Sequence, residues 1–134
     1  MHFPGLHWFF PILQGIFLGL LAMALHEAAH VIAAMAVGIK VKNIGFSWKG
    51  IYTVREPGPP EKNIFISLAG PLTNLALILC WAWSPTFGLA NLCFAASNLL
   101  PIQGSDGDRV LKCMDEMQKR TLLAESLNRA LMRL

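Results

Sequence analysis

The sequence predicts an all-α membrane protein with three transmembrane helices, a small β-hairpin between the first two and a C-terminal amphipathic helix. Hydrophobic residues make up 54% of its 134 residues and charged residues only 14%, whereas soluble domains carry about 25% charged residues. The apolar residues also gather in three long stretches with polar segments between them. Because the length suits one domain, we expect residues 1–134 to form a single unit.

The three apolar stretches are the candidate membrane spans, since a helix needs about 20 residues to cross a bilayer. The first covers residues 9–37 and begins with aromatic residues, which are common at the membrane interface. The second covers residues 63–83 and closes with two tryptophans. The third, residues 87–100, is marginal in length and ends at Pro101, which cannot continue a helix without losing a hydrogen bond.

The two polar segments have different patterns. Residues 39–56 are rich in β-branched and aromatic side chains and contain Lys49-Gly50 as a turn, which predicts a short hairpin. Residues 108–134 place apolar side chains mostly at helical spacing and charges on the other face. This pattern predicts an amphipathic helix that lies on the membrane surface or packs on the bundle.

The placement of positive charge predicts the orientation in the membrane. All lysines and arginines fall within residues 40–62 and 109–133. Cytoplasmic loops carry an excess of these residues, so we expect both segments in the cytoplasm and the N-terminus outside, in the cell membrane. The net charge of +3 therefore reflects topology, and we expect the lipid bilayer, and no nucleic acid, as a partner.

His26-Glu27-Ala28-Ala29-His30 lies inside the first apolar stretch. An H-E-x-x-H sequence on a helix puts two imidazoles on one face, where they can share a zinc ion, with the glutamate placed to deprotonate a bound water. Ionisable side chains in hydrocarbon cost at least about 2.5 kcal/mol each at mid-helix. The pattern favours a zinc protease that acts within the membrane. The alternative, two interior histidines hydrogen-bonded across helices, leaves Glu27 unexplained.

Small and polar residues recur on the first span at three- or four-residue spacing. Small residues let transmembrane helices approach closely, so we expect this stripe to face the interior of the bundle. Its members are Gly15, Gly19, Ala22, His26, His30 and Ala33.

A catalytic zinc ion generally takes three protein ligands, so the two histidines need a third. His2 and His7 fall at the outer end of the first span, far from the cytoplasmic half that holds the motif. The remaining acids near an apolar segment are Asp106 and Asp108, just after the third span.

Two further motifs complete a recognisable set. Asn98-Leu99-Leu100-Pro101 followed by Asp106-Gly107 resembles the N-x-x-P-x-x-x-x-D-G motif of the site-2 protease family of intramembrane metalloproteases. The segment from Ala69 to Asn74 resembles the A-G-P-x-x-N motif on that family's second helix. With H-E-x-x-H, the motifs occur in the family's order on three successive spans and cover about residues 20–111. The chain resembles the family's three-helix catalytic core.

The resemblance implies a role for each matching residue. His26, His30 and Asp106 would be the zinc ligands, and Glu27 the general base. Asn98 would orient the substrate carbonyl or stabilise the oxyanion. The same resemblance assigns helix packing to Gly70 and Pro71, and an interior polar position to Asn74.

One departure from the family pattern concerns the third ligand. The family usually reads D-G-G, whereas this chain reads Asp106-Gly107-Asp108. Asp108 suits the first turn of the tail helix, whose free amides favour an anion. The other reading is that it competes with Asp106 for the metal.

The expected function is that of a zinc-dependent intramembrane endopeptidase that cleaves a transmembrane protein or peptide in or near its membrane segment. The hairpin would hold the substrate by β-addition or serve as a connector. One alternative is a non-catalytic relative that acts as a membrane regulator, against which the intact Glu27 argues. Another is a metal-handling membrane protein, although the outer half lacks a path of ligands. Self-association to shield the cleft is compatible with so small a bundle.

Overall fold

The computed structural model describes residues 6–47 and 50–133, with side chains placed from Phe9 onward except around the hairpin turn. The chain is mostly helical with one two-stranded antiparallel sheet, in agreement with the predicted order of elements. The elements are α1 (Leu6–Ala36), β1 (Val41–Ser47), β2 (Gly50–Arg55), α2 (Pro60–Leu77), the 3₁₀ helix η1 (Ile78–Ala82), α3 (Pro85–Leu99) and α4 (Asp106–Leu131).

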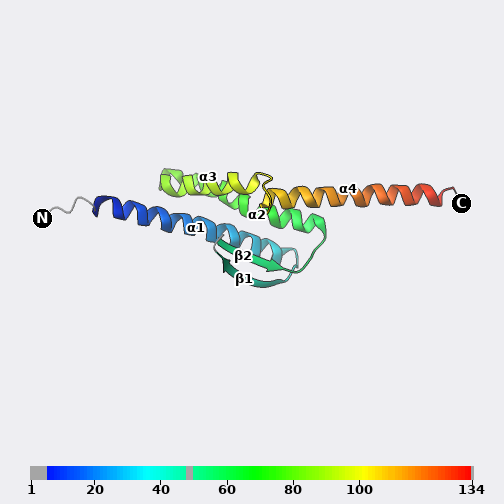
Figure 1. Ribbon diagram of the computed structural model, residues 1–134, viewed down its shortest axis with the longest axis horizontal. Helices are drawn as coiled ribbons and strands as arrows, with labels where there is room; N and C mark the ends of the chain where they lie inside the picture. The colour runs from blue at the N-terminus through cyan, green and yellow to red at the C-terminus, as the bar shows by residue number, and fades with distance from the viewer. Residues whose placement is uncertain (1–5, 48–49, 134) are drawn as a thin grey trace.

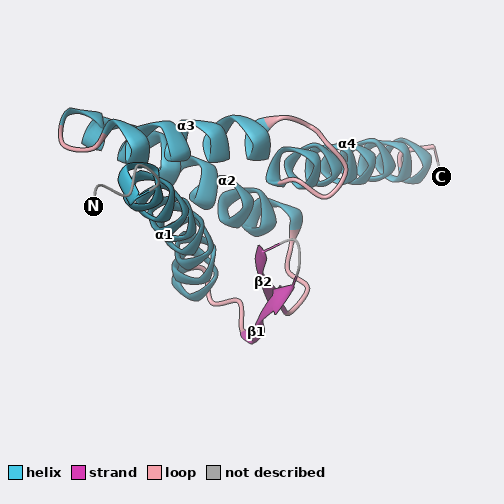
Figure 2. Cartoon of the chain, turned by 60° about the vertical axis from the view of Figure 1, so that its left-hand side comes forward, coloured by secondary structure: helices cyan, strands magenta, loops and turns pink. Residues whose placement is uncertain are grey.

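Helices α1, α2 and α3 contact one another and run in alternating directions (Figure 1). The hairpin lies beside the C-terminal half of α1, and α4 extends away from the same end of the bundle (Figures 1 and 2). The two segments that carry the lysines and arginines therefore lie at one end of the molecule.

Within the described residues, two helices are long and apolar enough to cross a membrane: Phe9–Ala36 in α1 and Pro60–Ala82 in α2 with η1. Only 11% and 28% of their most apolar windows are buried, whereas the core helix of a soluble protein would be mostly buried. Large apolar side chains such as Phe10, Phe17 and Ile32 are between 65% and 68% exposed. So much exposed apolar surface is typical of a protein that contacts lipid.

The third predicted span forms α3, which has 15 residues. A crossing takes about 20, so the length of α3 does not establish it as a span. Its ends follow from the sequence. Ser84 caps the first turn by accepting a hydrogen bond from the Phe87 amide, and Pro85 occupies the first helical position. The helix ends just before Pro101, because the residue preceding a proline disfavours helical backbone.

The C-terminus of α1 is closed by Gly38, whose φ of 75° is readily adopted only by glycine. The amide of Ile39 donates to the Ala34 carbonyl and that of Gly38 to the Met35 carbonyl, the pattern of a Schellman motif. Ile39 is thereby turned back into a small core with Ala33, Ala34 and Ile66. This core fixes α1 against α2 about one turn beyond His30.

The loop from α3 to α4 places the first residue of α4 against the bundle. Gly104 has a φ of 90°, and Ser105 caps α4 by accepting a hydrogen bond from the Asp108 amide. A side chain at Gly107 would collide with the Leu99 carbonyl oxygen, a backbone atom that cannot move aside. The contact therefore requires glycine and fixes Asp106 at the end of α3.

The predicted hairpin is present, with residues such as Ile44 paired to Thr53 and Phe46 to Ile51. An irregularity at residues 41–43 shifts the register by one residue. Of the predicted turn, Lys49 lies outside the described part of the chain, and Gly50 is the first residue of β2. Strand β2 contacts α1 more extensively than β1 does, so its residues lie closest to the histidine motif.

The predicted interior stripe of α1 is confirmed in its C-terminal half and wrong in its N-terminal half. Ala22, Ala33 and both histidines are buried. A methyl group added at Gly15 or Gly19 would meet nothing within 4 Å among the described residues. Among the described residues, therefore, no other helix packs closely against these two glycines.

Helix α4 contacts α2 along its first turns, and its residues from 118 to 133 are all exposed. Ion pairs one turn apart, such as Lys119 with Asp115 and Arg120 with Glu116, line this exposed part. Such exposed pairs contribute little to stability. The sequence predicted that this helix lies on the membrane surface or packs on the bundle. The first turns of α4 pack on the bundle.

Candidate metal and catalytic centre

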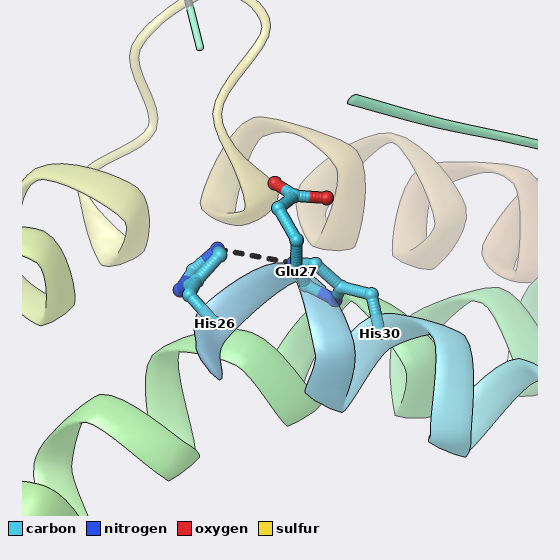
Figure 3. Close-up of side chains that lie close together, drawn as sticks. All are labelled: His26, Glu27 and His30. Atoms are coloured by element: carbon cyan, nitrogen blue, oxygen red, sulfur yellow. Dashed lines mark hydrogen bonds between the residues drawn. The ribbon is translucent and has the colours of Figure 1, made fainter. Parts of the chain in front are cut away.

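His26 and His30 project from successive turns of α1 toward α2 and α4, and Glu27 lies between them on the same helix (Figure 3). Each histidine is only 4% exposed, and their Nε2 atoms lie 3.1 Å apart. The helical spacing of four residues explains this meeting, because side chains at i and i+4 share one face.

Asp106 brings the third group to the same point from the other end of the sequence. Its Oδ2 lies 3.1 Å from the Nε2 of His26 and 3.1 Å from that of His30. Its Oδ1 accepts a hydrogen bond of 3.3 Å from Arg109, one turn along α4. Burial raises the pKa of this carboxyl, whereas hydrogen bonds from the facing imidazoles, when these are protonated at Nε2, lower it below its usual range.

The other nitrogen of each histidine faces a hydrogen-bond acceptor. His30 Nδ1 lies 2.7 Å from the Ile66 carbonyl oxygen, and His26 Nδ1 lies against Asn74 Oδ1. The Asn74 amide nitrogen donates to Asn91 Oδ1 and to the Ala22 carbonyl, which leaves its oxygen for His26. Both Nδ1 atoms must therefore donate. In neutral imidazoles each Nε2 then carries a lone pair.

Three lone-pair atoms thus converge with separations of 3.1 Å each. Without a cation or a proton among them, such an arrangement is repulsive. Zinc bound tetrahedrally at about 2.0–2.1 Å needs ligand atoms about 3.3 Å apart. The second nitrogen of a metal-binding histidine usually donates to a carbonyl or carboxylate oxygen. The donor set fits a zinc ion on both counts.

Gly70 allows α2 to pass directly under this donor set. A Cβ atom at this position would lie 2.5 Å from the Nε2 of His30 and 2.7 Å from that of His26. Real Cβ atoms do not approach so closely, so any side chain here would displace the imidazoles. The resemblance implied a packing role for Gly70. In the structure, the side chains that pack against Gly70 are the two histidines.

Glu27 is partly exposed and lies at the edge of the donor set. A carboxylate oxygen of Glu27 and one ring nitrogen of each histidine lie within 4.8 Å of one another, so these residues also qualify as a group that could hold a metal. The Glu27 Oε2 accepts a hydrogen bond of 3.3 Å from the Thr53 hydroxyl on β2. This contact directs the carboxylate toward the hairpin and away from α2.

A cleft of about 500 Å³ opens over these residues. The histidines, Glu27 and Asp106 form one side, and the β2 residues from Ile51 to Arg55 form another. Asn98 also lines the cleft, and its amide nitrogen donates one hydrogen bond to the Phe94 carbonyl. Because a side-chain amide has two N–H groups, the second can reach a ligand, since it has no partner among the described residues.

Asp108 lies outside the donor set. Its Oδ2 accepts hydrogen bonds from the Gly104 amide at 2.9 Å and from Lys112 at 2.8 Å. These bonds lower the pKa of Asp108 below its usual value. Asp108 thus lies in the first turn of α4 and holds the loop before it, whereas the cap of the helix is Ser105. Of the other histidines, His2 lies outside the described residues and the side chain of His7 is not described.

Three residues outside the predicted set contact a predicted site residue: Asn91, Thr53 and Arg109. Asn91 had a signal, since it is an amide in an apolar segment, where polar side chains are costly. Thr53 and Arg109 had none, because both lie in polar segments where their residue types are ordinary.

We expect Asn74→Ala to weaken zinc binding by about 10- to 100-fold, the usual effect of losing a hydrogen bond to a metal-binding histidine. Without the Asn74 oxygen, His26 loses the contact that selects its tautomer and ring orientation. A zinc titration against a competing chelator measures the change. Asn98→Ala is the control, because it removes an amide that does not contact the histidines. Equal affinities in the two variants would contradict the role of Asn74.

Comparison with known proteins finds two relatives, both named as zinc metalloproteases. The chain is 32% identical over 129 residues to "Putative zinc metalloprotease sll0528" of Synechocystis sp., covering 82% of this chain and 34% of that protein. It is 38% identical over 76 residues to "Putative zinc metalloprotease MJ0611" of Methanocaldococcus jannaschii, covering 46% of this chain and 40% of that protein. No family model matches the chain.

The two matches cover less than half the length of either relative. Their names support a zinc metalloprotease family for this chain, and the possible metal group of His26, Glu27 and His30 agrees with it. Zinc is likewise the metal that these names suggest. The two long apolar helices suggest association with a membrane.

Proposed function

We propose that the protein is a zinc-dependent intramembrane endopeptidase of the site-2 protease family. The observation that carries the proposal is the convergence of His26, His30 and Asp106 within 3.1 Å of one another beside Glu27. Two of these groups belong to a helix that is apolar and mostly exposed. A metal site for a soluble substrate would have no need of such a helix.

In this proposal His26, His30 and Asp106 hold the zinc ion. When bound there, zinc supplies Lewis acidity, which acidifies water and polarises a peptide carbonyl. Glu27 takes the proton of the attacking water as the carbon–oxygen bond forms, and returns it to the amine nitrogen when the carbon–nitrogen bond breaks. The free N–H of Asn98 would donate to the substrate carbonyl oxygen as negative charge develops on it.

In this proposal the hairpin would hold the substrate. A helical substrate hides its amide bonds, so the segment to be cleaved must unwind. Strand β2 pairs with β1 on one edge, and its residues line the cleft. An unwound segment added along β2 would be extended, with its carbonyls directed into the cleft. The other reading of the hairpin, as a connector, predicts that changes in β2 leave cleavage unaltered.

We also propose that α1, α2 with η1, and α3 are three spans, with the N-terminus outside and the C-terminus in the cytoplasm. The alternating directions of the helices and the position of all the basic segments at one end support this arrangement. The centre lies toward that end, so water would reach it from the cytoplasmic side. The partners are then the bilayer and a transmembrane protein or peptide.

Removal and return of the metal test the proposal. Purified protein is incorporated in vesicles with a panel of single-span reporters that carry a tag at each end. We expect a chelator to abolish cleavage and added zinc to restore it, with mass spectrometry placing the cut in or near the membrane segment. Folded protein that binds no zinc would instead favour a regulator. Zinc bound without cleavage of any reporter would favour metal handling.

A further inference from the structure

A second cavity adjoins the candidate centre on the far side of Glu27. It has a volume of about 290 Å³ and lies between α1 and the hairpin. Its walls are apolar apart from Glu27 and Thr53, and it shares these two residues and Ile51 with the main cleft. The remaining wall residues are Ala24, Ala28, Val31 and Ile32 of α1 and Ile44 of β1.

We propose that this apolar pocket receives a large aliphatic or aromatic side chain of the substrate, next to the bond that is cleaved. The inference rests on the proposed function and adds a substrate class to it. The pocket would select peptides in which a residue such as leucine or phenylalanine flanks the scissile bond, and would reject small or acidic residues there.

The position of Glu27 argues for this occupant. When a peptide carbonyl reacts beside Glu27, the side chains on either side of the scissile bond also lie close to Glu27. Glu27 and Thr53, which are joined by a hydrogen bond, line both the polar cleft and the apolar pocket. A peptide in the cleft therefore has the pocket within reach of one side chain. An acyl chain of a lipid would fit the apolar walls equally. It would not, however, explain why the pocket shares Glu27, Thr53 and Ile51 with the cleft.

The geometry of β2 supports the same conclusion. Ile51 and Thr53 are two residues apart, so both point to the face of the hairpin that meets α1. In a segment added beside β2, alternate side chains would point to that same face. One of them would then lie level with Ile51 and Thr53, at the mouth of the pocket.

The walls explain the expected selectivity. Ala24 and Ala28 are one turn apart on α1, and their small side chains leave the space open. An apolar side chain would leave water for this space, whereas an acidic one would lose hydration and face the negative charge of Glu27. Apolar pockets discriminate by about 10- to 200-fold for each missing methylene group.

Hydroxamates provide a test that does not depend on cleavage, because their two oxygens chelate zinc. We would measure the affinity of zinc-loaded protein for three peptide hydroxamates that differ only in a methyl, isobutyl or benzyl side chain. We expect the isobutyl and benzyl compounds to bind at least about tenfold more tightly than the methyl compound. Ala24→Leu should fill the pocket and remove this preference while leaving the methyl compound unaffected.

Ala36→Leu is the matched control, since it makes the same change on the same helix but lines a different groove, between α1 and α2. It should retain the preference. Ile51→Ala, which enlarges the pocket, should shift the preference toward benzyl and serves if Ala24→Leu does not fold. Equal binding of the three compounds to wild type, or a preference unchanged in both pocket variants, would overturn the pocket while leaving the metal centre intact. Folded protein that takes up no zinc, and therefore binds none of the hydroxamates, would overturn the proposed function itself.

Discussion

Glu27→Gln should reduce cleavage of any reporter that the wild type cuts by at least about 10²- to 10⁴-fold, the usual contribution of a general base. Glutamine has nearly the same shape but cannot take a proton at neutral pH. The side chain lies at the edge of the donor set, which is already complete with His26, His30 and Asp106. Zinc content should therefore stay at the wild-type level.

Rates on the reporter panel and zinc per chain, measured on the same preparation, check both halves of this expectation. Thr53→Ala is a suitable control, because it removes the hydrogen bond to Glu27 and leaves the carboxylate in place. It should cost much less activity than Glu27→Gln. Continued turnover by Glu27→Gln would exclude Glu27 as the base. Loss of zinc with loss of turnover would make Glu27 a ligand instead, as its distance from the histidines also allows.

Local rules account for most of the helix boundaries and for half of the centre. Pro101 ends α3, and Ser84-Pro85 begins it, because these residues act through their own backbone. The pairing of His26 with His30 follows in the same way from helical spacing. Gly15 and Gly19 show the limit of such reasoning. Their spacing permits close packing, but whether another helix lies opposite depends on how far the bundle extends.

The rest of the centre depends on contacts between distant segments. Asp106 is 80 residues from His26, and only the resemblance to a family placed them together. The Ile66 carbonyl that receives the His30 hydrogen bond is a backbone atom, so no residue type in the sequence marks it. Arg109 holds Asp106 through its second oxygen, but an arginine in a basic helix gives no sign of this role.

Zinc content should also decide between the two aspartates that begin α4. We expect about one zinc per wild-type chain, loss of it in Asp106→Ala, and retention in Asp108→Ala. Asp106 supplies one of three converging donor atoms, so its removal leaves two ligands and an open side toward the cleft. Asp108 makes its contacts with Gly104 and Lys112, away from the histidines.

The two variants should differ in stability as well. Measuring stability shows whether a variant loses zinc only because it is unfolded. Asp108→Ala loses the hydrogen bond that its carboxylate accepts from the Gly104 amide just before α4, so it should unfold at a somewhat lower temperature while keeping its zinc. Metal-free wild type and metal-free Asp106→Ala both lack the zinc ion. A comparison of their unfolding temperatures therefore shows whether the substitution itself disturbs the fold. If Asp108→Ala loses zinc and Asp106→Ala keeps it, the third ligand moves two residues along the chain. The geometry argues against that result, since only Asp106 is buried between the histidines.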